Sequence, residues 1–76
     1  MSSNWHKTLA SISDQVDKRV LEEFLLRVRP LGEPANMVVL ESPTREVAEA
    51  IRREYAKQLS DALSLVTGGR LSQVSI

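Results

Sequence analysis

Few residues of this chain are suited to chemistry, and their spacing matches no catalytic or metal site. His6 is the one histidine, and the chain has no cysteine, so it forms neither a thiolate metal site nor a disulfide. Glu22 and Glu23 are adjacent, and adjacent helical residues point in different directions, so they share neither a proton nor a metal. Gly68-Gly69-Arg70 lacks the lysine–hydroxyl pair of a phosphate loop. We expect no enzymatic activity, no cofactor and no bound metal.

A cluster of basic residues is a second candidate for chemistry. Its members lie on a predicted helix and are suited to contact the phosphates of a single-stranded nucleic acid: Arg45, Arg52, Arg53 and Lys57. Acids are interleaved with them, and ten acidic and ten basic residues give the whole chain a formal net charge of zero. Nucleic-acid binders usually carry a clear basic excess. Weak single-strand binding is therefore an alternative function that ranks below protein binding.

Apolar spacing predicts two short helices at the start of the chain. One stripe recurs at intervals of four, three and four residues, as on one face of a helix: Trp5, Leu9, Ile12 and Val16. A broader stripe follows over residues 20–28, and Pro30 ends it because proline disfavours helical geometry in the residue before it. Trp5 begins the first stripe, so the pattern alone places it in the core.

The rest of the chain predicts three strands and one long helix. A β-branched run at residues 37–41, a weaker edge strand at 29–33 and apolar–polar alternation at 71–76 are typical of strands. Thr44 is the predicted N-cap of the helix. The apolar stripe of this helix runs over residues 47–66, widened by Leu63 and Leu65. Glycine readily takes the left-handed conformation, so residues 67–69 end the helix.

These elements predict one α+β domain over residues 1–76. Two short helices and one long helix pack on a small three-stranded sheet, and the crossover through the long helix allows the last strand to join in parallel. No apolar run approaches the roughly 20 residues that span a bilayer. The first residues also lack the apolar segment of a signal peptide. We expect a cytoplasmic protein that has no contact with a membrane.

Several segments also occur in a specific order and spacing. Trp5 opens the first helix, and "EFLLRVRPL" at residues 23–31 contains a Glu-Phe pair ahead of Arg-Pro-Leu. "NMVVLESP" at residues 36–43 ends in a proline, and Tyr55 stands twelve residues after Pro43. Together these segments span nearly all of the chain, and they resemble the N-terminal domain (domain I) of the bacterial replication initiator DnaA.

The resemblance implies a compact αα–ββ–α–β fold related in shape to KH domains, and a protein–protein interaction module of replication initiation. Such domains self-associate through the face of the first helix, contact the replicative helicase and initiation regulators, and in some cases touch single-stranded DNA weakly. The resemblance thus implies a weak homodimer associated with the nucleoid. By position it implies these protein-interaction residues: Trp5, Glu23, Thr44 and Glu46.

Four positions depart from the family pattern. The tryptophan of the family is Arg27 here, its asparagine after the proline is Thr44, and two further aromatics are replaced: by Glu46 and Ala50. A full initiator also has an ATPase domain and a helix-turn-helix domain that binds duplex DNA, and these do not fit in 76 residues. The alternative is a free-standing regulator that mimics the first domain of the initiator. If Trp5 serves self-association, Trp5→Ala weakens the dimer and leaves the fold largely intact.

Overall fold

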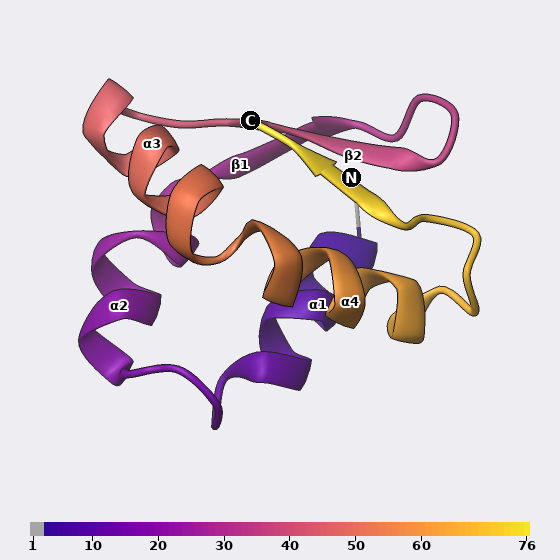
Figure 1. The fold of residues 1–76 in the computed structure, drawn as a ribbon, viewed down its shortest axis with the longest axis horizontal. Helices are drawn as coiled ribbons and strands as arrows, with labels where there is room; N and C mark the ends of the chain where they lie inside the picture. The colour runs from indigo at the N-terminus through magenta and orange to yellow at the C-terminus, as the bar shows by residue number, and fades with distance from the viewer. Residues whose placement is uncertain (1–2) are drawn as a thin grey trace.

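Three strands form one mixed sheet at the top of the molecule in Figure 1, with helices beneath it and one helix beside it on the left. The structure is a computed structural model that describes residues 3–76. Residues 1 and 2 of the predicted domain lie outside the described residues. In chain order the elements are α1 (Ser3–Ile12), α2 (Lys18–Glu23), the 3-10 helix η1 (Leu25–Arg27), β1 (Arg29–Gly32), β2 (Met37–Glu41), α3 (Arg45–Glu54), α4 (Ala56–Val66) and β3 (Gln73–Ser75).

The α+β class and the three strands are confirmed. The strand order is β1-β2-β3, with β1 antiparallel and β3 parallel to β2. The parallel pairing agrees with the crossover through the helical segment after β2. Val38 and Leu40 alternate on β2 as its two buried residues, so one face of the strand points into the core.

The core lies between the sheet and the helices. The core draws on α1, η1, β2, α3, α4 and the residues just ahead of β1 and β3, and its buried apolar members are Trp5, Leu9, Ile12, Leu25, Val28, Val38, Leu40, Val47, Ile51, Leu59, Leu63 and Leu71. Burying one such aliphatic side chain fully is worth about 1.5–3 kcal/mol, so this cluster dominates the stability of a small domain. Within residues 3–76, no helix has the length and apolar character required to cross a bilayer.

The prediction of one long helix is wrong. α3 ends at Glu54 and α4 begins at Ala56, and the ribbon changes direction between them (Figure 1). Tyr55, at the break, has φ −125° and ψ −5°. The helical hydrogen bonds continue on both sides of it, because its N–H donates to Ile51 O and its carbonyl accepts from Leu59 N–H, each at 2.9 Å.

The spacing of the buried residues explains the break. Val47, Ile51, Leu59 and Leu63 fall at multiples of four residues and are all buried. An α-helix turns by about 100° per residue, so each four-residue step drifts by about 40° around the axis. Over the four steps from Val47 to Leu63, a straight helix would drift by about 160° and turn Leu63 away from the core. The change of direction at Tyr55 lets both ends of the stripe face inward.

The second predicted helix is also shorter than the apolar stripe suggested. α2 ends at Glu23, Phe24 leaves helical geometry with φ −120°, and a 3-10 turn carries the chain to Val28. Leu25 becomes fully buried in that turn, whereas Leu26 is exposed. The tighter turn thus places Leu25 in the core just before β1 begins.

The C-terminus of α4 lies at the predicted residues. Gly68 and Gly69 have φ of 63° and 87°, in the left-handed region. Gly69 N–H donates to Ser64 O at 2.8 Å and Gly68 N–H to Leu65 O at 3.5 Å, the two bonds of a Schellman motif. The Thr67 hydroxyl accepts from Leu71 N–H at 3.0 Å, which ties the helix end to the buried residue ahead of β3.

The Schellman motif predicts a specific cost at Gly68. Gly68→Ala is expected to lower the free energy of unfolding by about 1–2 kcal/mol, because a Cβ disfavours the left-handed conformation. Gly32→Ala is the matched control, since Gly32 has no positive φ and an added Cβ would meet no atom within 4 Å at either glycine. Urea denaturation of both variants measures the difference. Equal losses would contradict the backbone explanation.

Candidate protein-interaction surface

The structure places Trp5 in the core. Its side chain is 1% exposed, and it belongs to the same buried cluster as Leu9 and Ile12 of α1. This agrees with the position that the apolar stripe predicts. In this conformation the indole has almost no surface for a second molecule, so the self-association role implied for Trp5 finds no support in its position.

Glu23 lies at the exposed C-terminus of α2. Its Oε2 pairs with Arg19 Nε at 2.6 Å, four residues earlier on the same helix. The Glu23 carboxylate raises the pKa of the Arg19 guanidinium by accepting this hydrogen bond and by its charge. A partner that binds Glu23 would therefore compete with an existing ion pair in solvent.

Thr44 and Glu46 lie at the N-terminus of α3. Thr44 Oγ1 accepts a hydrogen bond from Val47 N–H at 3.1 Å, which confirms the predicted N-cap. Glu46 is exposed in the first helical turn, where an acid interacts favourably with the positive end of the helix dipole. Glu23, Thr44 and Glu46 come from two helices, and no hydrogen bond or ion pair of these three joins one to another.

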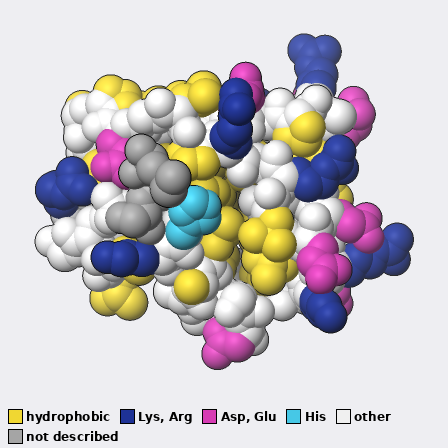
Figure 2. Space-filling view, turned by 180° about the vertical axis from the view of Figure 1, so that it is seen from behind, with side chains coloured by type: hydrophobic (Ala, Val, Ile, Leu, Met, Phe, Trp, Pro, Cys, Tyr) yellow, Lys and Arg dark blue, Asp and Glu magenta, His cyan; other side chains and the backbone are white. Residues whose placement is uncertain are grey.

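Each of the four predicted nucleic-acid contacts has a partner within the chain. Three of these basic side chains pair with an acid: Arg45 with Glu49 at 3.7 Å, Arg53 with Glu54 at 3.1 Å and Lys57 with Asp61 at 3.0 Å. Arg52 Nη2 donates to the backbone oxygen of Ile76 at 2.7 Å. On the face drawn in Figure 2, basic and acidic side chains are mixed and form no continuous basic area among the described residues.

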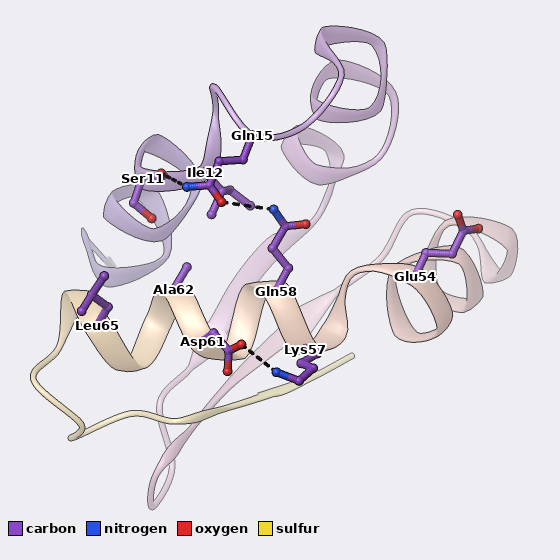
Figure 3. A pocket seen from close by; sticks show the side chains of 9 residues that line it. All are labelled: Ser11, Ile12, Gln15, Glu54, Lys57, Gln58, Asp61, Ala62 and Leu65. Carbon is purple, nitrogen blue, oxygen red and sulfur yellow. Dashed lines mark hydrogen bonds and ion pairs between the residues drawn. The ribbon is translucent and has the colours of Figure 1, made fainter.

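A groove between α1 and α4 is the most distinctive surface feature. Its volume is about 530 Å³, and it is lined by Ser11, Ile12, Gln15, Glu54, Lys57, Gln58, Asp61, Ala62 and Leu65. Leu65 is 84% exposed, the highest value among the exposed large apolar residues of the described chain. Figure 3 shows Leu65 beside Ala62 at one end of the groove.

The lining of the groove combines an apolar strip with polar side chains. Ala62 and Leu65 supply apolar surface, whereas the Ile12 side chain is only 2% exposed. Gln58 Nε2 donates to Gln15 Oε1 across the groove at 3.4 Å (Figure 3). The Lys57–Asp61 ion pair lies along α4 on the same lining. No group of three or more histidine or acidic side chains in residues 3–76 is placed to hold a metal ion. The arrangement is suited to receive an apolar side chain and to hydrogen-bond around it.

The sequence pattern assigned Leu65 to the inner stripe, and that assignment is wrong. Leu63 is fully buried, and residues two apart on a helix do not share a face, so Leu65 points outward. This spacing is the signal that could have revealed the exposed leucine. The groove beside it depends on how α4 packs against α1, which no local pattern encodes.

Because Trp5 is buried in the core, its side chain is expected to stabilise the fold. Trp5→Ala is expected to lower the free energy of unfolding by about 3–5 kcal/mol, because it removes a large buried side chain and leaves a cavity. His6→Ala is the control, since His6 is the exposed neighbour on the same helix. Thermal and urea denaturation measure both variants. A Trp5→Ala protein as stable as its parent would favour the interface role instead.

The N-cap predicts the effect of changes at Thr44. Thr44→Ala is expected to cost about 1 kcal/mol of stability, because Val47 N–H loses its acceptor. Thr44→Ser keeps a hydroxyl at the same position and is expected to retain most of that stability. Urea denaturation compares the three proteins, and equal losses in both variants would argue against the capping bond.

Comparisons with known proteins do not identify a family or a function for this chain. No protein-family model matches the chain. A search of the curated proteins also returns no match. The resemblance to the first domain of DnaA therefore depends on the order and spacing of the residues described above, and the surface features of the fold must support any functional conclusion.

Proposed function

We propose that this chain is a non-enzymatic protein–protein interaction module that binds its partner in the α1–α4 groove. One observation carries the proposal: a leucine that is 84% exposed lies on the lining of a groove of about 530 Å³. Exposing a leucine this fully gains nothing for the monomer, whereas covering it with a partner recovers about 1.5–3 kcal/mol for an aliphatic side chain.

A helix is the partner element that suits this groove. Most of the groove lining comes from α1 and α4, with Gln15 just after α1 and Glu54 at the end of α3, and an amphipathic helix can lay its apolar face into a groove between helices. Ala62 and Leu65 would meet its apolar residues. The carboxamides of Gln15 and Gln58 would remain at the polar margin, where they can hydrogen-bond to the partner.

The resemblance to domain I of DnaA supports a more specific role for this module. On that basis we place it in replication initiation, in the cytoplasm at the nucleoid, with the replicative helicase or an initiation regulator as partner. A free-standing regulator that competes for the same partners is the alternative form of this role. Both forms require a docking surface for protein, and the groove supplies one.

The arrangement of charges supports nucleic-acid binding less well than the groove supports protein binding. Arg45, Arg53 and Lys57 each lie beside an acid of the same helix, and Arg52 bonds to the backbone of Ile76. Binding to phosphates would have to break or share these contacts. We therefore expect at most weak binding to a single-stranded oligonucleotide at low salt, falling steeply as salt is added.

The docking role of Leu65 is tested with the purified replicative helicase of the same organism. Leu65→Ser is expected to weaken binding by about tenfold or more, because a buried apolar anchor is lost from the interface. Leu31→Ser is the matched control, since Leu31 is 57% exposed on β1, outside the groove. Isothermal titration calorimetry measures the affinities, and circular dichroism checks the fold.

The outcomes separate the two parts of the proposal. Loss of binding in Leu65→Ser, with Leu31→Ser unchanged, supports both the groove and the replication role. Equal affinities for the parent and Leu65→Ser would place the contact elsewhere and reject the groove. No binding of the parent to the helicase or to the initiation regulators of that organism would reject the role in replication initiation.

A further inference from the structure

The two edges of the sheet differ in how they are protected. The strand order makes β1 and β3 the outer strands of the described sheet. β1 contains the charged Arg29, Pro30 without an N–H, and an irregularity at Leu31, where the pairing to β2 shifts. Charges, proline and bulges are the features that keep an edge strand from pairing with another chain. β3 has none of these and pairs regularly with β2.

The hydrogen bonds of β3 show which backbone groups face its open edge. Gln73 N–H donates to Asn36 O at 3.2 Å, in the parallel register that pairs Gln73 with Met37. Successive residues of a paired strand direct their N–H and C=O to opposite sides. Gln73 and Ser75 therefore face β2, and Val74 directs its N–H and C=O toward the open edge.

A second groove runs along this edge. Its volume is about 320 Å³, and its apolar lining comes from Met37, Ile51, Ala56, Val74 and Ile76. Arg52 also lines it and donates from Nη2 to Ile76 O at 2.7 Å. This bond holds the backbone just after β3 against α3. A strand that is already ordered loses less conformational entropy when it pairs.

We propose that the β3 edge pairs with β3 of a second copy of this chain, antiparallel across a two-fold axis at Val74. At that axis the N–H of each Val74 donates to the carbonyl of the other, since both groups point outward. Opposed residues of such a pair place their side chains on the same face. The second copy's Val74 then extends over the apolar groove, and one continuous sheet crosses the two molecules.

The edge is self-complementary, which favours a second copy over an unrelated strand. A two-fold contact requires the same residue to supply donor and acceptor at the axis, and Val74 does so. Gln73 would lie opposite the second copy's Ser75, so both flanking pairs are uncharged and no like charges meet directly. β3 is three residues long, which limits the contact and makes the association weak. This inference is independent of the proposed function, because the two grooves share no residue.

Sedimentation velocity and ¹⁵N–¹H spectra of the parent between about 10 µM and about 1 mM test the contact. The parent is expected to associate across this range, with concentration-dependent shifts of the Val74 amide. Val74→Pro is expected to weaken association by about tenfold or more, because it deletes the outward N–H and leaves the hydrogen bonds of Gln73 and Ser75 to β2 in place. Leu31→Lys, at the opposite edge, is expected to associate like the parent.

Each other outcome overturns the proposal. A parent that is monomeric at about 1 mM has no such edge contact. A folded Val74→Pro variant that associates like the parent excludes the pairing at Val74. If Val74→Pro fails to fold, the dilution spectra of the parent decide, since shifts confined to residues away from β3 place the contact on another surface. Association that is lost in Leu65→Ser, without shifts at Val74, places it in the α1–α4 groove.

Discussion

The four-residue spacing of the inner stripe after β2 is the constraint on which the structure depends. Val47 and Ile51 on α3, and Leu59 and Leu63 on α4, must all reach one core, and a straight helix would turn the last of them away. The break at Tyr55 resolves this conflict. It also directs α4 against α1 (Figure 1), and the side chains of the two helices form a groove between them. The candidate docking surface is thus a consequence of core packing.

The same constraint determines which residues remain for function. With α4 packed on α1, Trp5 is enclosed by the core, and the outward side of α4 carries Leu65, exposed two residues after the buried Leu63. Apolar surface that is suited to a partner therefore comes from the helix that closes the fold. Thr44 likewise has a structural role, because its hydroxyl caps α3.

Residues with a strong local signal could be predicted from the sequence. The β-branched run of β2, the N-cap at Thr44 and the glycines that end α4 each have a preference that does not depend on distant contacts, and each lies where predicted. The break at Tyr55 could not be assigned in the same way, because the apolar periodicity tolerates a helix that is either straight or broken. The two grooves depend on pairs of elements distant in sequence, which a single-sequence pattern does not relate.

Charge neutrality limits how this protein can associate. Its acids and bases balance, and the cations of α3 and α4 lie beside acids or a backbone oxygen, so no strong field attracts a partner over long range. Association must then depend on short-range apolar and backbone contacts, each of which is weak. The α1–α4 groove and the β3 edge share no residue, so both can be occupied together. Two copies joined at β3 would present two grooves, and a multimeric partner could engage both with an affinity that neither reaches alone.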